Sequence, residues 1–287
     1  MIKKLTYYYK IADSPLKLIY INIGIFLIFQ ILNTLSYLTE NSELNTIEIF
    51  GLPSQFSHFI FKPWSLFTYM FTHQDFIHIV LNLIWLHFSG KIFTQYFNSQ
   101  KLIDVYILGG IIGGICYLLA YRYLPVFQNQ TNFLIGASGS VLAVLFASAS
   151  FAPNYKVNLA FLGPVSIKYI ALSYIFIDVI SIPIGNAGGH IAHLGGALSG
   201  IVFVSQWKKQ IDITKYLNKY RRNLIGIFKN KNLKTLYKRP ITDDEYRLNK
   251  KVNSKKVDDI LEIIANSGYD SLSEDEKDFL FKQSKNL

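Results

Sequence analysis

The sequence predicts an all-α membrane protein: a bundle of six transmembrane helices followed by a small helical C-terminal region. The 287-residue chain is 51% hydrophobic and 15% aromatic, and its mean hydropathy is +0.24. An ordinary soluble domain is less apolar than this. Six stretches of about 20 mostly apolar residues are each long enough to cross a bilayer as a helix. They lie near residues 17–38, 75–97, 102–121, 133–152, 165–184 and 187–206.

The first stretch follows a lysine-containing leader, residues 1–16. Its apolar part is too long for a signal peptide and no small-residue cleavage site follows it, so we expect it to remain as a span. The membrane domain is then expected over residues 17–207. The connection of about residues 39–74 should lie on the outer face, with amphipathic aromatics at the membrane interface. These aromatics are Phe61, Trp64, Phe67 and Tyr69.

The lysines of the short loops predict the orientation, because such residues are enriched on the cytoplasmic side. If the amino terminus is inside, only Lys62 and Arg122 are left outside. We therefore expect both termini in the cytoplasm. The membrane is separately expected to be a bacterial inner membrane. The lysines that then share the inner side are Lys3, Lys4, Lys10, Lys91, Lys101, Lys156, Lys168, Lys208 and Lys209.

After the last span, residues 208–242 form a basic linker. From Lys208 to Arg239 the sequence contains 11 Lys and Arg and a single acid, Asp212. Near anionic lipid each such charge contributes about 1 kcal/mol of attraction. A flank that merely fixes the topology of the last span would explain the same charges.

Residues 243–287 are expected to form a small cytoplasmic domain of two short amphipathic helices. Gly268 is expected to end the first helix, and Ser273 with Glu276 has the pattern of a capping box that starts the second. One apolar face of the first helix contains Val257, Ile260, Leu261 and Ile264.

Ser138 stands between Gly136 and Gly139 at the start of the fourth apolar stretch. One interpretation is packing alone, because Gly136 and Ser140 are four residues apart, as are Gly139 and Ala143, and small residues let membrane helices approach closely. The other interpretation is a nucleophile. Peptide hydrolysis needs water, so the hydroxyl would lie near the outer end of its helix, at a cavity where glycines permit close backbone approach.

The sixth stretch supplies a candidate base. His193 is followed by Gly196 and Gly200, three and seven residues on, so all three lie on nearly one helix face. This face would let the sixth helix pack closely on the fourth. His193 could then accept the serine proton and return it to a leaving amine. A histidine bonded to a nearby backbone carbonyl is the alternative.

His78 and Asn82 lie at i and i+4 in the second stretch, roughly 5 to 6 Å apart at their Cβ atoms. Both side chains can donate hydrogen bonds to one developing oxyanion, together with the backbone N–H of Ser138. The alternative is hydrogen bonding between helices of the bundle.

These motifs resemble those of the rhomboid intramembrane serine proteases in order and spacing: His78 and Asn82, then Gly136-Ala137-Ser138-Gly139, then Ala192-His193-x-x-Gly196-x-x-x-Gly200. The resemblance covers about residues 55–206, and the six-span count agrees with it. It implies a rhomboid-like bundle without a cofactor.

The resemblance also implies roles for single residues. Ser138 would be the nucleophile and His193 the base of a dyad that requires no carboxylate. His78, Asn82 and the Ser138 amide would form the oxyanion hole, and the four glycines named above would support the site. The substrate implied is a transmembrane helix of another membrane protein, cut near the outer face of the lipid bilayer after a small residue.

Further positions have secondary roles in this resemblance. His73 matches a position where rhomboids often have a histidine, and we expect a structural hydrogen bond there. His190 is expected at the outer end beside His193, and Asp178 is the one acid that could orient a histidine. Three features depart from the family pattern, one of which is that the Arg often found in the first long loop is not evident around Trp64. Leu142 stands where many rhomboids have an aromatic residue, and Lys91 follows Gly90 where a Glu is common.

Other function classes are less well supported. A catalytically inactive rhomboid-like protein that binds transmembrane helices would keep the fold, but it would not need Ser138. A metal-dependent membrane enzyme or transporter is disfavoured. The pattern H-x-x-H at His190 and His193 lacks the Glu of the zinc motif H-E-x-x-H, and no suitable cluster of carboxylates accompanies it. We therefore expect no bound metal. Cys116 is the single cysteine. The net charge of the chain is +10, but the positive residues are concentrated beside a membrane span and include no nucleic-acid recognition motif. Nucleic-acid binding is therefore rejected. No feature indicates an oligomeric state.

Overall fold

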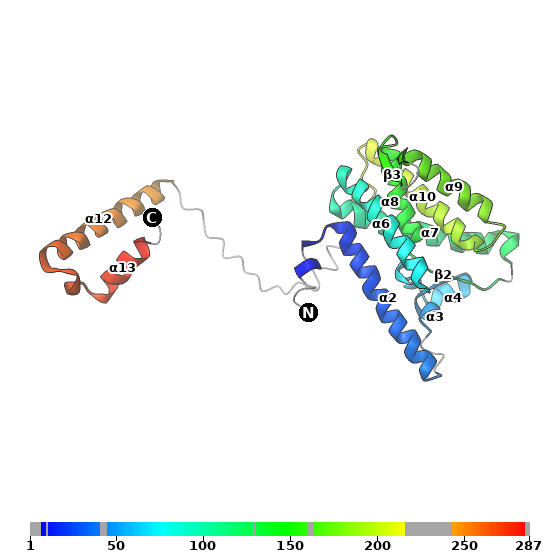
Figure 1. Ribbon diagram of the computed structural model, residues 1–287, viewed down its shortest axis with the longest axis horizontal. Helices are drawn as coiled ribbons and strands as arrows, with labels where there is room; N and C mark the ends of the chain where they lie inside the picture. Colours follow the sequence, from blue (N-terminus) through cyan, green and yellow to red (C-terminus); the bar gives the residue numbers. More distant parts are fainter. Residues whose placement is uncertain are drawn as a thin grey trace. The chain divides into compact units, whose positions relative to one another are not determined.

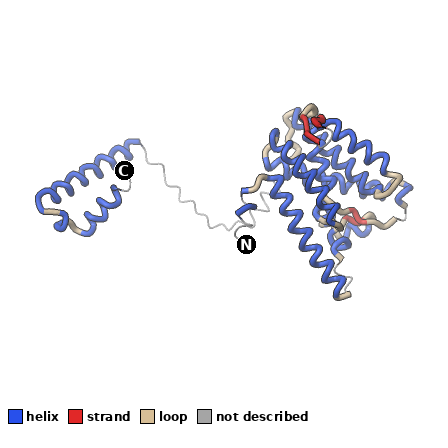
Figure 2. Tube along the Cα trace, in the orientation of Figure 1, coloured by secondary structure: helices blue, strands red, loops and turns tan. Residues whose placement is uncertain are grey.

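The computed structural model describes residues 7–9, 11–40, 45–128, 130–159, 163–215 and 243–284. The chain divides into two compact units, Met1–Phe228 and Lys229–Leu287. Helices dominate both units (Figure 1). The prediction of a mainly helical protein is therefore confirmed. The only strands in the described residues are two short antiparallel pairs, which the sequence analysis did not predict (Figure 2).

Four helices of the described chain are long and apolar enough to cross a membrane, and they match four of the six predicted stretches. Each of the first three begins where a side-chain oxygen accepts a hydrogen bond from the first turn: Asp13, Asp75 and Asn98 cap them in turn. The helices are α2 (Ser14–Leu38), α6 (Phe76–Tyr96), α7 (Ser99–Tyr123) and α10 (Ala187–Lys208).

The other two predicted spans are shorter than expected. Helix α8 (Ser138–Phe151) has 14 residues and α9 (Ile167–Ser181) has 15. At 1.5 Å per residue each is about 21 to 23 Å long, against about 30 Å of hydrocarbon. A paired strand precedes each of these helices and contains residues that were expected to be helical. Strand β2 (Phe133–Leu134) pairs with β1 (Leu52–Pro53), and β4 (Gly163–Ser166) pairs with β3 (Lys156–Leu159).

The connection between α2 and α6 contains several short helices. Phe61, Trp64 and Phe67 are exposed, as expected for interfacial aromatics, but the expectation for Tyr69 is wrong. Its ring is buried and its hydroxyl donates to the Gly110 carbonyl at 2.6 Å, because the glycines of α7 leave room for it. The short helices are α3 (Thr46–Phe50), α4 (Phe56–Phe61), α5 (Ser65–Thr68) and η2 (Tyr69–Phe71), and η3 (Pro125–Phe127) follows α7.

Helix α8 forms the core of the first unit, Met1–Phe228, since every residue from Gly139 to Ala149 is buried. It packs on α6, α7, α9 and α10, while α2 lies at the edge of the bundle against α6 and α7 (Figure 1). The contact between α8 and α10 is backbone to backbone. A Cβ on Gly196 would lie 2.1 Å from the Gly139 carbonyl oxygen, and one on Gly200 would lie 2.1 Å from that of Ala143. Such contacts require small residues.

We expect Gly196→Ala to destabilise the protein by about 1 to 3 kcal/mol, because the added methyl group would push α10 away from α8. Cleavage activity should fall as well, since His193 is on α10 and Ser138 is on α8. Thermal unfolding in detergent measures the first effect. Gly24→Ala is the matched control, because nothing lies within 4 Å of a Cβ there; that variant should be as stable as the parent or slightly more so. Equal stability of both variants would contradict the packing argument.

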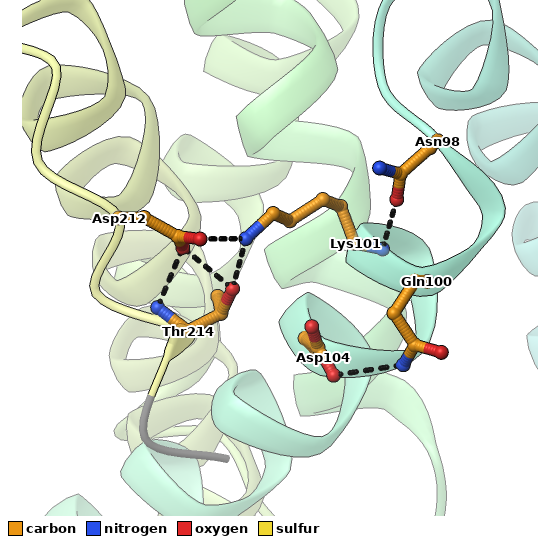
Figure 3. A network of polar contacts seen from close by, with 6 residues as sticks. All are labelled: Asn98, Gln100, Lys101, Asp104, Asp212 and Thr214. Carbon is orange, nitrogen blue, oxygen red and sulfur yellow. Dashed lines mark hydrogen bonds and ion pairs between the residues drawn. The ribbon is translucent and has the colours of Figure 1, made fainter. Parts of the chain in front are cut away.

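A polar network joins the first turn of α7 to the segment after α10 (Figure 3). The Lys101 ammonium is buried, donates to Asp212 and Thr214, and lies 5.3 Å from the ring centroid of Trp207. Thr214 in turn donates to Asp212 from its amide at 3.0 Å and from its hydroxyl at 2.7 Å. The network fixes the chain where it leaves the bundle.

The network predicts a pH dependence of stability. Burial alone would raise the pKa of Asp212, but the hydrogen bonds from Lys101 and Thr214 and the charge of Lys101 outweigh it, so this pKa is lowered. A carboxyl with a lowered pKa in the folded state stabilises the fold above its ordinary pKa of about 3.9, and this contribution is lost as the pH falls towards the lowered value. We expect the melting temperature to fall in that window, and to fall less steeply in Asp212→Asn. Identical slopes in parent and variant would show that the pair is not coupled to folding.

The second unit consists of α12 (Asp243–Ser267), η4 (Tyr269–Ser271) and α13 (Glu274–Ser284). Gly268 ends α12 with a φ of +81°, and Glu276 accepts hydrogen bonds from the Ser273 amide at 2.8 Å and hydroxyl at 2.6 Å. Gly268 therefore ends the helix as predicted. Of the predicted capping box, the structure has the bond from the Ser273 amide to Glu276, whereas the Glu276 amide donates to the Ser273 backbone carbonyl. Helix α12 has 25 residues, which is longer than the short helix predicted, and Ile260 is buried whereas Leu261 is exposed.

Candidate active site

Ser138 is the first residue of α8, and two hydrogen bonds hold the turn before it in place. Gly136 has a φ of +109°, a conformation that favours glycine. Its amide donates to the Tyr69 carbonyl at 2.9 Å, and the next amide, that of Ala137, donates to Nε2 of His73 at 3.3 Å. The first N–H groups of a helix lack intrahelical acceptors, so the Ser138 amide lies in a turn that can bind an anion.

His73 contacts two backbone groups through its two ring nitrogens. It is 2% exposed, and its Nδ1 lies 3.3 Å from the Phe71 carbonyl oxygen. Burial, reinforced by nearby His78, lowers the pKa of His73 to about 4. The neutral ring can donate from Nδ1 and accept at Nε2, which is what its two backbone partners require. His73 thereby fixes the backbone immediately before the serine.

Ser138 and His193 lie in direct contact. Nε2 of His193 is 2.7 Å from Oγ of Ser138, and Nδ1 of the same ring is 2.9 Å from a carboxylate oxygen of Asp178 on α9. The carboxylate accepts a hydrogen bond from the N–H at Nδ1, so the lone pair of Nε2 faces the hydroxyl. The arrangement can take a proton from Ser138 and keep the resulting imidazolium in place.

His190 also contacts Asp178 and lies one turn before His193 on α10. Its Nδ1 is 2.7 Å from the same oxygen, Oδ1, that accepts from His193. The two imidazole rings are 5.8 Å apart and perpendicular. Of the two histidines in GHIAH, it is His193 that contacts the serine. Asp178 is the acid that could orient a histidine, but nothing in the sequence indicates that one of its oxygens contacts both rings.

His78 and Asn82 are brought to the other side of the serine. A Cβ on Gly136 would lie 2.6 Å from Nε2 of His78 and 3.8 Å from Nδ2 of Asn82, so both side chains lie close to the backbone before Ser138. Asn82 is buried and donates one hydrogen bond to the His78 carbonyl at 3.1 Å. An amide nitrogen has two hydrogens, so a second donor is left.

These groups line a cavity of about 650 Å³. Its wall contains Ser138, His193, His78 and Asn82, and Leu142 lies beside them in place of the aromatic residue common in rhomboids. On one side α6 and α9 contribute Trp85 and Tyr174, whose rings are perpendicular and 5.1 Å apart. These two aromatics were not predicted as site residues from the sequence. In the sequence they look like any other apolar residue of a span, and only the approach of α6 to α9 brings them to the cavity.

The glycines predicted to support the site all lie at close contacts. Gly136 lies under the ring of His78, and Gly139 faces Gly196 as described above. The predicted site residues therefore lie in the cavity wall, in the turn before Ser138 or in the α8–α10 contact, with two exceptions. His73 contacts that turn through the Ala137 amide, and His190 contacts the site through Asp178.

The fold and these contacts define an integral membrane protein with a serine and a histidine hydrogen-bonded in the wall of a cavity. Residues 61–207, about half of the chain, match the family described as Rhomboid domain. The chain belongs to the rhomboid family, which includes serine proteases. Residues 242–286 match a second family, which is described as of unknown function, DUF6576.

Three relatives illustrate the similarity. RHOMBOID-like protein 12, mitochondrial, of Arabidopsis thaliana is 29% identical over 196 residues, which is 64% of this chain and 55% of the relative. Presenilin-associated rhomboid-like protein A, mitochondrial, of Danio rerio is 26% identical, over 53% of this chain and 40% of the relative. Rhomboid-like protease 3 of Toxoplasma gondii is 26% identical, over 53% and 54%. The chain thus spans about half the length of the curated relatives it matches.

Proposed function

We propose that this protein is an intramembrane serine endopeptidase that hydrolyses a peptide bond in or near a transmembrane helix of another membrane protein. The observation that carries the proposal is the 2.7 Å contact between Ser138 Oγ and His193 Nε2 within the cavity. Packing alone would explain a small residue at position 138, but it would not explain a hydroxyl that faces an imidazole fixed by a carboxylate.

The proposed reaction has two steps. Ser138 Oγ attacks the carbonyl carbon of the scissile bond while Nε2 of His193 takes the serine proton. The same proton then passes to the leaving amine, and an acyl-enzyme remains on Ser138. Water, deprotonated by His193, releases the acyl group and restores the serine. Asp178 acts as a positioning residue, because its bond to Nδ1 keeps Nε2 free to accept.

We propose that three donors stabilise the oxyanion of the tetrahedral intermediate: His78, Asn82 and the Ser138 amide. The proposal is supported by their positions around Gly136 and by the place of Ser138 at the start of a helix. Donors fixed in advance stabilise developing charge without reorganisation. His73 supports them by holding Ala137.

We further propose a six-span bundle in a bacterial inner membrane, with both termini in the cytoplasm. The short helices α8 and α9 would be the fourth and fifth spans, and α8 is covered by its neighbours along its length, so it needs little contact with lipid. Four longer helices supply the remaining spans. The partners are then the lipid bilayer and transmembrane substrates. Reporter fusions at each loop test the topology.

The test of function is reconstitution in liposomes with a single-span substrate and detection of its fragments by mass spectrometry. We expect cleavage by the intact protein, none by Ser138→Ala or His193→Ala, and no loss of cleavage when a chelator is added. Cleavage that survives either substitution would refute the dyad. The second candidate function, an inactive protein that binds transmembrane helices, predicts co-purification of the substrate equally with the intact protein and with Ser138→Ala, without fragments from either.

A further inference from the structure

Asp178, His190 and His193 form a compact cluster beside Ser138. The carboxylate oxygen and ring nitrogens that they offer all lie within 4.8 Å of one another. The Asp178 side chain is only 7% exposed, and those of His190 and His193 are 18% and 21% exposed. The H-x-x-H pair lacked a carboxylate in the sequence, but the fold brings one from α9, twelve and fifteen residues before the two histidines.

We infer that this cluster is an inhibitory binding site for a divalent transition-metal ion of the Zn²⁺ class. This inference rests on the proposed function, because it assigns a way to switch off the same dyad. It does not make the protein a metalloenzyme: the reaction proposed above uses the site without metal.

The ligand set suits Zn²⁺. Two imidazole nitrogens and one carboxylate oxygen, with a fourth position open to water, are a common arrangement around this ion. Zinc bonds to nitrogen and oxygen are about 2.0 to 2.2 Å long, so ligand atoms about 3.3 Å apart fit a tetrahedral site. The two Nδ1 atoms are now 2.7 and 2.9 Å from Oδ1, and a small outward movement of side chains is sufficient. Mg²⁺ and Ca²⁺ prefer oxygen ligands and would bind less well.

Metal binding would block the base through its tautomer. Without metal, the contact with Asp178 favours the proton on Nδ1 of each ring, and Nε2 of His193 has a free lone pair. An ion bound at Nδ1 uses the lone pair there, so in each neutral ring the proton must be on Nε2. His193 would then present an N–H to Ser138 in place of an acceptor. No proton is released by the rings, and the serine keeps its own.

The binding test uses the full-length Ser138→Ala protein in detergent, so that it does not depend on activity. Co²⁺ serves as the probe through the visible absorption of tetrahedral Co²⁺, and Zn²⁺ is then added to displace it. We expect one ion per chain. In Asp178→Asn and His190→Asn, affinity should fall by more than the roughly 10- to 100-fold that loss of an outer-shell partner costs. His58→Asn removes an exposed histidine far from the cluster in sequence and should leave affinity unchanged.

The second test measures cleavage by the protein with Ser138 intact. Zn²⁺ should inhibit cleavage, a chelator should reverse the inhibition, and His190→Asn should need a higher Zn²⁺ concentration for half-inhibition, each rate being taken relative to the same variant without metal. Absence of saturable binding, or equal affinity in His190→Asn, overturns the inference and leaves the protease proposal intact. Binding by a protein that cleaves no substrate overturns the proposed function and the inhibitory role with it.

Discussion

Replacing Ser138 by alanine is expected to lower the rate of substrate cleavage by about 10⁴- to 10⁶-fold, as loss of the nucleophile does in serine proteases. The hydroxyl is half-buried at the first turn of α8, and in the proposed reaction the acyl-enzyme forms on its oxygen. Binding of the substrate should persist, because the cavity wall is otherwise unchanged. The measurement is single-turnover cleavage in liposomes, with substrate affinity determined separately.

His193→Ala should have an effect of similar size, and the double variant should be no slower than either single variant, because nucleophile and base act as one unit. Ser140→Ala is the matched control. Its hydroxyl is buried in the same helix two residues away and contacts the Met70 sulfur at 3.7 Å, outside the cavity wall. This variant should retain most of the activity. Additive losses in the double variant would contradict a shared role of Ser138 and His193.

The agreement between sequence and structure was best where helix periodicity decides which residues share a face. His78 with Asn82, and His193 with Gly196 and Gly200, were assigned to common faces from spacing alone. The structure places each set on one contact surface. Small residues also predicted the close approach of α10 to α8, because no larger side chain fits there.

The sequence failed where long-range pairing decides the outcome. The fourth and fifth spans were predicted to be longer helices than the structure has. For the fourth, nothing near Phe133 and Leu134 in the sequence shows that they pair with a strand some 80 residues earlier. For the fifth, a strand pair precedes the helix. Lys101 was counted among the loop lysines that predict the membrane orientation, yet it is buried against Asp212, which is 111 residues away in the sequence. Tyr69 was placed at the membrane interface for its residue type, whereas the room beside Gly113 and Gly114 and the hydrogen bond to the Gly110 carbonyl determine its burial.

Asp178 illustrates the same limit within the site. Its distance along the chain from His190 and His193 is short, but α9 and α10 are separate helices whose relative rotation the sequence does not reveal. Only the packing of these helices brings one carboxylate oxygen to two rings. The triad-like geometry and the metal-binding inference both follow from this single feature of tertiary structure.

The second large effect is expected from the oxyanion hole. Asn82→Ala should reduce the rate of the chemical step by about 10²- to 10³-fold, the usual cost of removing one preorganised donor. Asn82 is 7% exposed and lies close to the turn at Gly136, so its amide is held by the fold before substrate arrives. The loss should appear in kcat and little in KM, because the donor acts mainly on charge that develops in the transition state.

Two comparisons separate this role from a structural one. Asn82→Asp has nearly the same shape but replaces the donor by an acceptor, so it should be at least as slow as Asn82→Ala, whereas a packing role would be preserved. His78→Ala should cause a loss of similar order, and because both side chains serve one oxyanion, the loss in the double variant should differ from the sum of the two single losses. If Asn82→Asp kept full activity, the oxyanion would have to be stabilised by the Ser138 amide and His78 without Asn82, and the second span would contribute one donor in place of two.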